Sequence, residues 1–142
     1  MSLVLDNSVA MLWLLPQSNL GGVALAEKVL GLMQQSGAVV PSLWALEAAN
    51  VMAKAQRMGK INQAQSSAFI ALLESLPINA DNQTAGRALH DTLDLAHRYG
   101  LSAYDAAYLE LALRMQLPLA TLDQELQKAA EDAGVALVGV DR

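Results

Sequence analysis

The sequence predicts an α/β fold in which a single domain, residues 1–142, forms a three-layer α/β/α sandwich. Its central sheet is expected to be parallel and to contain about five strands. Three observations support this class. Short apolar segments of strand length alternate with segments of helical periodicity along the whole chain. A chain of 142 residues is large enough for one domain with a sizeable core. No internal repeat, low-complexity segment or linker divides it.

The first predicted strand covers residues 3–5, an apolar run with the β-branched Val4 at its centre. This run ends abruptly at Asp6. An apolar stretch follows, and we expect it to be helical until Pro16 stops it. In an open α/β sheet, ligands bind outside the carboxyl ends of the strands. Asp6 therefore lies where a functional site is expected.

The rest of the chain continues the same alternation. Further strands are expected at residues 38–40, 77–80, 117–121 and 135–140. Helices are expected at about residues 20–35, 43–58, 63–76, 84–99, 103–115 and 122–133. The polar side chains suited to cap three of these helices are Ser42, Asn62 and Ser102. In the helix over residues 84–99, the stripe expected to be buried consists of Ala85, Ala88, Leu89, Leu93 and Ala96.

Composition narrows the function classes. Hydrophobic residues make up 54% of the chain, more than a small monomer needs, so part of the apolar surface is expected at an interface. The longest apolar run, residues 9–15, is far shorter than the ~18 residues of a membrane span, and no basic leader with a cleavage site precedes it. We therefore expect a soluble, cytoplasmic protein without membrane association. The absence of cysteine excludes disulfides and thiolate metal sites.

The formal net charge of −5 argues against broad electrostatic attraction to nucleic acid, because such binding depends on basic residues that face phosphates. The charge does not exclude an enzyme that acts on nucleic acid. If several acidic residues surround a divalent metal ion, the local field is much less negative than the formal count implies.

Four acidic residues are expected to converge at the carboxyl edge of the sheet. Asp6 follows the first strand, Asp105 lies in the first turn of a helix, and Asp123 follows the fourth strand. Glu47 lies one turn into a helix that begins at the same edge, and its spacing from apolar neighbours turns it toward packed structure. Converging carboxylates repel each other unless they are protonated or bound to a cation. With oxygen ligands and no cysteine, the expected ion is Mg²⁺ or Mn²⁺ rather than Zn²⁺.

Each of these acids also has a purely structural explanation. Asp6 could cap the first helix, and Asp123 could cap the last one. Ser102 and Asp105 fit the capping-box pattern, which would give Asp105 a structural role. Glu47 is harder to explain in this way, since an unpaired carboxylate among apolar neighbours is costly and the sequence shows no obvious Lys or Arg partner.

Two further clusters allow both a functional and a structural interpretation. The first cluster is His90, Asp94 and His97, which have the helical spacing of a transition-metal site. These residues lie opposite the apolar stripe of their helix, which favours a solvated face. The second cluster is Lys54, Arg57 and Lys60, which could contact phosphates. Basic residues near a helix C-terminus also complement the helix dipole, which would give them a structural role.

Four segments carry the acidic residues in a characteristic order. They are residues 4–9 (Val-Leu-Asp-Asn-Ser-Val), 46–50 (Leu-Glu-Ala-Ala-Asn), 101–108 (Leu-Ser-Ala-Tyr-Asp-Ala-Ala-Tyr) and 119–123 (Leu-Ala-Thr-Leu-Asp). Together they resemble the motifs of the PIN-domain family, and particularly those of the bacterial VapC-type ribonuclease toxins. The resemblance covers essentially the whole chain. Each motif alone is weak, but four in this order and spacing are fairly specific.

The resemblance implies a parallel sheet of strand order 3-2-1-4-5, with the strand before Asp6 at its centre. It also implies an acidic pocket for Mg²⁺ or Mn²⁺, in which Asp6, Asp105 and Asp123 lie nearest the metal. Glu47 would act on the metal directly or through water. Three polar residues match positions that lie near the pocket or near its acids in family members. They are Ser8, Asn50 and Thr121.

The implied activity is that of a metal-dependent endoribonuclease, which hydrolyses RNA phosphodiester bonds with a metal-activated water. Because the chain is acidic overall, RNA is expected to bind in a local groove that includes Lys54, Arg57 or Lys60. Toxins of this type are usually homodimers. They are silenced by the cognate antitoxin of a type II toxin–antitoxin system, whose C-terminal segment covers the active site.

Two other functions compete with this one. A receiver-like Mg²⁺-binding signalling module also clusters acids at strand ends, but it needs an acceptor Asp after a middle strand and a Lys late in the chain. Here the third strand offers only Asn79, and no Lys follows the fifth strand. A catalytically inactive PIN-like interaction domain would use its acids as helix caps, and its stability would not respond to metal.

Overall fold

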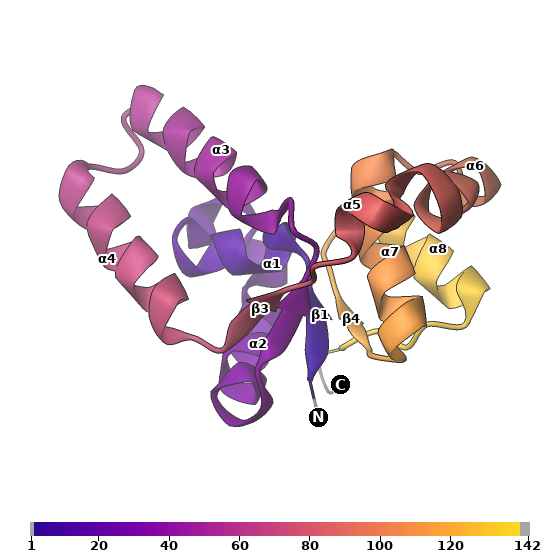
Figure 1. Ribbon diagram of the computed structural model, residues 1–142. Helices are drawn as coiled ribbons and strands as arrows, with labels where there is room; N and C mark the ends of the chain where they lie inside the picture. Colours follow the sequence, from indigo (N-terminus) through magenta and orange to yellow (C-terminus); the bar gives the residue numbers. More distant parts are fainter. Residues whose placement is uncertain (1, 140–142) are drawn as a thin grey trace.

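The computed structural model describes residues 2–139 and confirms the predicted class, with helices on both faces of a parallel sheet (Figure 1). The strand order is β3-β2-β1-β4, and every neighbouring pair is parallel. The strands are β1 (Leu3–Leu5), β2 (Ala38–Val40), β3 (Ile78–Ala80) and β4 (Leu119–Ala120). This order makes β1 an inner strand, so the residue that follows it, Asp6, lies between the ends of β2 and β4.

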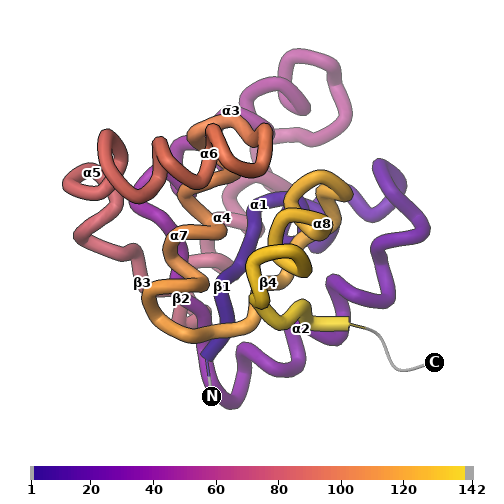
Figure 2. The backbone as a smooth tube through the Cα atoms, turned by 90° about the vertical axis from the view of Figure 1, so that its right-hand side faces the viewer, coloured from indigo at the N-terminus to yellow at the C-terminus, as the bar shows by residue number. Residues whose placement is uncertain are grey.

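The helices cover both faces because each crossover between parallel strands returns over the sheet. Figure 1 shows α1 to α4 on one side of the strands and α5 to α8 on the other, and Figure 2 views the molecule from the second side. The first group is α1 (Asn7–Ala10), α2 (Val23–Ser36), α3 (Trp44–Arg57) and α4 (Gln63–Ser75). The second is α5 (Thr84–Arg87), the π-helical segment η4 (Ala88–Thr92), α6 (Leu93–Tyr99), α7 (Ala103–Met115) and α8 (Gln124–Ala133). Among residues 2–139, no helix is both long enough and apolar enough to cross a bilayer.

The hydrophobic core lies on both faces of β1, all of whose residues are buried. It includes fully buried side chains from the inner strands and from helices on both sides of the sheet: Val4, Leu5, Val29, Met33, Leu109, Leu111, Leu119 and Leu126. Burial of a side chain of this size contributes about 1.5–3 kcal/mol. A strand packed on both faces is held firmly, and this fixes the position of the acidic residue at its carboxyl end.

The predicted fifth strand is reduced to one bridge in the described part of the chain, so the sheet has four strands and not five. Leu137 pairs in parallel with Leu119 of β4. The Leu119 N–H donates to the Ala136 carbonyl, and the Val138 N–H donates to the Leu119 carbonyl, both at 2.9 Å. β4 has only two residues, which leaves little backbone for a longer ladder. The segment still lies beside β4, where the order 3-2-1-4-5 places a fifth strand, and Val140 lies outside the described residues.

The predicted helix between Asp6 and Pro16 is wrong beyond its first turn. α1 ends at Ala10, and three 3₁₀ segments follow, η1 (Met11–Trp13), η2 (Pro16–Ser18) and η3 (Leu20–Gly22). These tight turns bring Gly22 against Leu12. A Cβ atom on Gly22 would lie 2.8 Å from Leu12 Cδ1 and 2.6 Å from Leu122 Cδ1, so a larger residue here would displace the ends of these two leucine side chains. α2 therefore begins at residue 23 and not at residue 20.

Two of the three predicted helix caps are confirmed. At the start of α4, Asn62 and Gln65 form a capping box, in which each side chain accepts a 2.8 Å hydrogen bond from the other residue's N–H. At the start of α7, Ser102 Oγ accepts from the Asp105 N–H at 3.1 Å. Ser42 does not cap α3, since that helix begins without a side-chain cap. The Ser42 N–H instead donates to Thr84 Oγ1 at 3.0 Å.

The predicted helix over residues 84–99 is interrupted. Within η4, His90 has φ −121° and ψ −106°, outside the helical range, and the segment separates α5 from α6. The wider π turn rotates the residues that follow it relative to a continuous α-helix. The predicted buried stripe is wrong at three positions. Ala85, before the π turn, is exposed, and after the turn begins Leu89 is 79% exposed and Leu93 is 52% exposed, whereas Thr92 is buried.

Candidate metal centre

Asp6 lies at the carboxyl end of β1, and its side chain is buried. Asp6 Oδ2 accepts two hydrogen bonds, from Ser8 Oγ at 2.7 Å and from Thr121 Oγ1 at 2.6 Å. Each hydroxyl oxygen also accepts a backbone hydrogen bond, from the Leu122 N–H at 3.0 Å and from the Asp123 N–H at 3.1 Å respectively. These backbone bonds fix the two hydroxyls on Asp6. The two predicted supporting residues therefore orient one oxygen of this carboxylate.

Glu47 lies in the first turn of α3 and is partly buried. Its partner is Tyr108, whose hydroxyl donates to Glu47 Oε1 at 2.5 Å. No Lys or Arg within residues 2–139 forms an ion pair with Glu47. The neutral phenol supplies a hydrogen bond but no positive charge, so the negative charge of Glu47 is not compensated.

The structural explanation holds for some of the acids and fails for others. The Asp6 side chain makes no capping hydrogen bond to α1. Asp123 does cap α8, since Asp123 Oδ1 accepts from the Leu126 N–H at 2.9 Å. At the start of α7, Asp105 contributes its backbone N–H to the Ser102 cap, which does not require a carboxylate at that position.

The four acids lie within one another's electrostatic field. Burial raises the pKa of Asp6, and the charge of Asp123 raises it further, against hydrogen bonds that lower it. Burial also raises the pKa of Glu47, and the charges of Asp6 and Asp105 add to this. The pKa of Asp105 rises to about 6, first through burial and then through repulsion by Asp123 and Asp6. Each of the four acids is therefore near enough to at least one other to repel it.

The donor set suits a hard divalent cation, although the acids are spaced more widely than in a closed ligand shell. All four side chains offer oxygen, the ligand type that Mg²⁺ and Mn²⁺ prefer. Within the described range, no group of three or more His, Cys, Asp or Glu residues is close enough together to hold a metal ion. A cation bound between the carboxylates would relieve their repulsion and lower their pKa values.

Comparison with known proteins shows the family. A model of the PIN domain matches residues 3–132, which is most of the chain. The chain belongs to the PIN-domain family. Its fold is also similar to the crystal structure of PAE2754 from Pyrobaculum aerophilum, with a TM-score of 0.64 and 23% sequence identity over 91% of this chain and 87% of that chain. No curated protein matched.

PIN domains are generally metal-dependent nucleases, which agrees with a set of oxygen donors at the carboxyl edge of the sheet. The sheet order also removes the receiver-like alternative. Receiver-type sheets have the order 2-1-3-4-5, in which the third strand lies beside the first. In this PIN domain, β4 lies beside β1 and β3 forms the far edge.

The remaining predicted site residues of the PIN domain are exposed. Asn50 is exposed one turn after Glu47, and the buried face of α3 is formed instead by Trp44, Ala48, Met52 and Ala55. The three predicted RNA-binding residues, Lys54, Arg57 and Lys60, are exposed near the far end of α3. Lys54 is the nearest of the three to Glu47 in sequence. It follows Glu47 by seven residues, which corresponds to a rise of about 10 Å along the helix. His90, Asp94 and His97 are all exposed. The interpretation of this cluster as a solvated helix face therefore holds.

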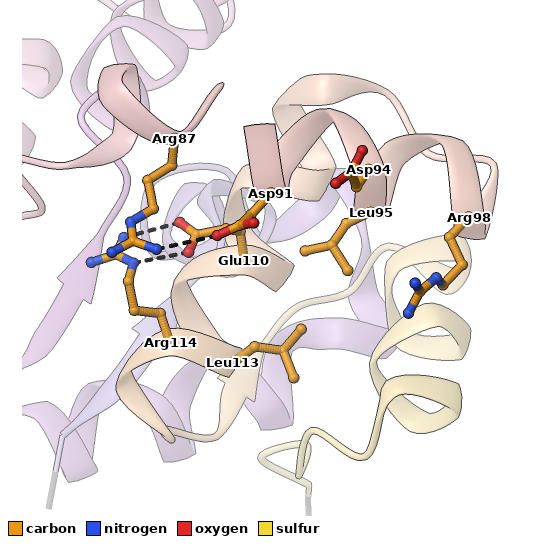
Figure 3. Close-up of a pocket in the computed structure, with 8 residues that line it drawn as sticks. All are labelled: Arg87, Asp91, Asp94, Leu95, Arg98, Glu110, Leu113 and Arg114. Atoms are coloured by element: carbon orange, nitrogen blue, oxygen red, sulfur yellow. Dashed lines mark hydrogen bonds and ion pairs between the residues drawn. The ribbon is translucent and has the colours of Figure 1, made fainter. Parts of the chain in front are cut away.

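A buried ion network on α7 was not predicted from the sequence. The Arg114 guanidinium donates to both oxygens of Glu110, at 2.8 and 3.0 Å, and to both oxygens of Asp81, at 2.6 and 3.2 Å. The network borders a hollow of about 430 Å³ on the outer side of α7 (Figure 3). The residues that line this hollow are Arg87, Asp91, Asp94, Leu95, Arg98, Glu110, Leu113 and Arg114. The i, i+4 spacing of Glu110 and Arg114 was the available sequence signal, whereas nothing local points to Asp81. None of the four predicted acids lines this hollow.

Proposed function

We propose that this PIN domain is the toxin of a type II toxin–antitoxin system and acts as a Mg²⁺- or Mn²⁺-dependent endoribonuclease. The observation that carries the proposal is negative charge without a basic partner. Burial and neighbouring carboxylates raise the pKa values of Asp6, Glu47 and Asp105, and no Lys or Arg of residues 2–139 pairs with them. Such perturbed groups gather at functional sites. Together with Asp123, they are the proposed metal-binding and catalytic residues.

A divalent ion held by carboxylates supplies a nucleophilic water at neutral pH and positive charge for the phosphate and the leaving 3′ oxygen. The protein's own contribution is to orient the donors. Ser8 and Thr121 occupy Asp6 Oδ2, and no side chain of the described residues donates to Asp6 Oδ1. In the same way, capping of α8 uses Asp123 Oδ1 and no described side chain donates to Oδ2. A carboxylate can therefore serve as a cap through one oxygen and bind a metal through the other.

The predicted RNA-binding residues lie in a segment of unusual charge. Between Glu47 and Glu74 the chain contains three basic residues and no acidic residue, although the whole chain carries a net charge of −5. The basic residues lie near the connection between α3 and α4, which Figure 1 shows extending away from the sheet. This local positive charge supports a role in binding the RNA backbone beyond the scissile phosphate. The proposed contacts are Lys54, Arg57 and Lys60.

The proposed partners are a cognate antitoxin and a second copy of the chain, and the proposed location is the cytoplasm, where the RNA substrate is found. The support is apolar surface that the described residues leave uncovered. Large side chains that are at least half exposed include Leu20, Leu46, Met58, Leu89, Leu93 and Tyr104. An interface would remove such side chains from water.

The proposed activity is tested with end-labelled RNA and the purified protein in Mg²⁺, Mn²⁺ or EDTA. The wild-type protein is expected to cut internally in the presence of either metal and not in EDTA. Asp6→Asn removes a metal-binding carboxylate and is expected to slow cleavage by ~100-fold or more. Asp91→Asn, a change at an exposed acid, serves as the matched control and should cleave normally. Equal cleavage by wild-type protein and Asp6→Asn would refute the assignment.

The second candidate is a catalytically inactive PIN-like interaction domain. It is favoured by two observations, the open spacing of the acids and the capping role of Asp123. A ligand that binds only the folded state must raise the melting temperature. A melting curve that millimolar Mn²⁺ leaves unchanged, together with the absence of RNA cleavage, would select this candidate over the nuclease.

A further inference from the structure

Tyr108 lies on the inner face of α7, one turn after Asp105, and its side chain is completely buried. A buried tyrosine hydroxyl usually has a hydrogen-bond partner, and a backbone carbonyl is sufficient for that purpose. In this protein the acceptor is a carboxylate from a different helix. The hydroxyl donates to Glu47 Oε1 at 2.5 Å, across 61 residues of sequence.

This hydrogen bond joins two helices that carry acids of the proposed site. Asp105 lies one turn before Tyr108 on α7, and Glu47 lies in the first turn of α3. One phenol group therefore connects the elements that carry Asp105 and Glu47.

Glu47 has no other anchor. Among residues 2–139, no second side chain hydrogen-bonds to it and no basic residue pairs with it. Its long side chain loses considerable conformational entropy when it is fixed in one position. Burial disfavours its charged form, and Asp6 and Asp105 repel it. The Tyr108 hydroxyl is the contact that works against all of these effects.

We propose that Tyr108 is a positioning residue of the acidic site, whose hydroxyl holds the Glu47 carboxylate at the edge where Asp6 and Asp105 lie. This inference rests on the proposed function, because it assigns Glu47 to the metal. Tyr108 itself touches neither metal nor RNA. Its effect is to keep a fourth oxygen donor within reach of an ion that would otherwise be held by the remaining acids.

The test is the affinity of the full-length, metal-free protein for Mn²⁺ alone, measured by the electron paramagnetic resonance signal of free Mn²⁺. Tyr108→Phe removes the hydroxyl and keeps the ring. Loss of a group that orients a ligand typically weakens metal binding ~10–100-fold, and a change in this range is expected. The matched control is Tyr99→Phe on α6, which should bind Mn²⁺ as the wild-type protein does.

A double-mutant cycle shows whether Tyr108 acts through Glu47. In a Glu47→Gln protein, the added Tyr108→Phe change is expected to alter Mn²⁺ affinity by less than ~2-fold, since the carboxylate to be positioned is already gone. An equal loss of affinity in both backgrounds would show a general structural role and overturn the inference. Melting in EDTA is recorded for every variant, and loss of the native transition in Tyr108→Phe would also overturn it.

The proposed function and the positioning role of Tyr108 can be refuted separately. If the wild-type protein does not bind Mn²⁺, the proposed function fails, and the inference about Tyr108 fails with it. If the wild-type protein binds Mn²⁺ and Tyr108→Phe binds it equally well, only the positioning role is refuted. Cleavage assays add a second readout, in which Tyr108→Phe is expected to lower kcat and to leave the KM for RNA unchanged.

Discussion

Thr121 and Asp6 are 115 residues apart in sequence, and the Thr121 hydroxyl donates a 2.6 Å hydrogen bond to Asp6 Oδ2. Both side chains are buried. The same hydroxyl accepts the Asp123 N–H at 3.1 Å, so one threonine connects the carboxyl ends of β1 and β4. The two acids that follow these strands are thereby held at a fixed separation.

Thr121→Val should destabilise the protein and weaken metal binding, because it removes a donor to Asp6 and an acceptor for the Asp123 N–H. Loss of a buried hydrogen bond that leaves its partners unsatisfied costs about 1–3 kcal/mol. Urea unfolding measures the free energy, and Mn²⁺ titration measures the affinity. Thr92→Val is the control, since Thr92 is buried in η4 and not at the acidic edge, and it should bind Mn²⁺ normally. Normal Mn²⁺ binding by Thr121→Val would contradict the role given to this hydroxyl.

Metal-dependent stability should increase with pH. The pKa of Asp105 is raised to about 6, so this group stabilises the metal-free fold at pH values below its unfolded pKa, and that contribution is lost as the pH rises through about 6. Asp6 and Glu47 are shifted in the same direction. Because Mn²⁺ binds the deprotonated carboxylates, its stabilising effect should be larger at pH 7.5 than at pH 5.5.

Melting temperatures in EDTA and in Mn²⁺ at the two pH values measure this effect. Asp105→Asn should reduce the difference between them, because it removes the group with the pKa of about 6. The same increase in melting temperature at both pH values would argue against metal binding by these carboxylates.

Arg114→Met should be strongly destabilising, because it leaves Glu110 and Asp81 without their cation. The side chains of this network are only 14% (Arg114), 5% (Glu110) and 8% (Asp81) exposed, and loss of one partner from a buried ion pair costs about 3–5 kcal/mol. The matched control is Arg87→Met, which breaks the surface pair with Asp91 and should cost less than ~1 kcal/mol. Urea unfolding of both variants provides the comparison, and equal costs would disprove the distinction.

Reversal of the basic charges near the connection of α3 and α4 should weaken RNA binding. The variant carries Lys54→Glu, Arg57→Glu and Lys60→Glu in an Asp6→Asn background, which prevents cleavage during the measurement. Fluorescence anisotropy over a range of salt concentrations should show weaker binding and a shallower salt dependence, by ~0.7 per lost contact with single-stranded RNA. Lys128→Glu on α8 is the single-site control. An unchanged salt dependence would exclude these residues from the RNA interface.

Local sequence was sufficient for those features whose causes are local. The apolar run of β1 and the capping box of Asn62 and Gln65 each lie within a few residues, and both were predicted correctly. The sequence also predicts that the acids converge, because the carboxyl ends of parallel strands meet at one edge. Asp123 shows the limit of this reasoning, since the residue type that caps a helix also suits a metal ligand.

Tertiary packing decided the features for which local preferences were weak or misleading. The periodicity of residues 84–99 suits one continuous helix, but η4 divides it and leaves Leu89 in solvent. The apolar stretch after Asp6 turns into 3₁₀ segments, which bring Gly22 close to the side chain of Leu12. In these places the energy of distant contacts exceeds the small differences between local backbone states.

By itself, the sequence determined the α/β class and the inner position of the Asp6 strand within a family pattern, and it predicts four acids at one edge. The tertiary structure alone decided which oxygen of Asp6 the predicted hydroxyl of Thr121 holds, and that Tyr108 holds Glu47. Thr121 reaches Asp6 across 115 residues, and Tyr108 reaches Glu47 across 61. The physical reason is that apolar periodicity specifies which face of an element is buried, whereas a hydrogen bond between two elements depends on their packing distance and rotation.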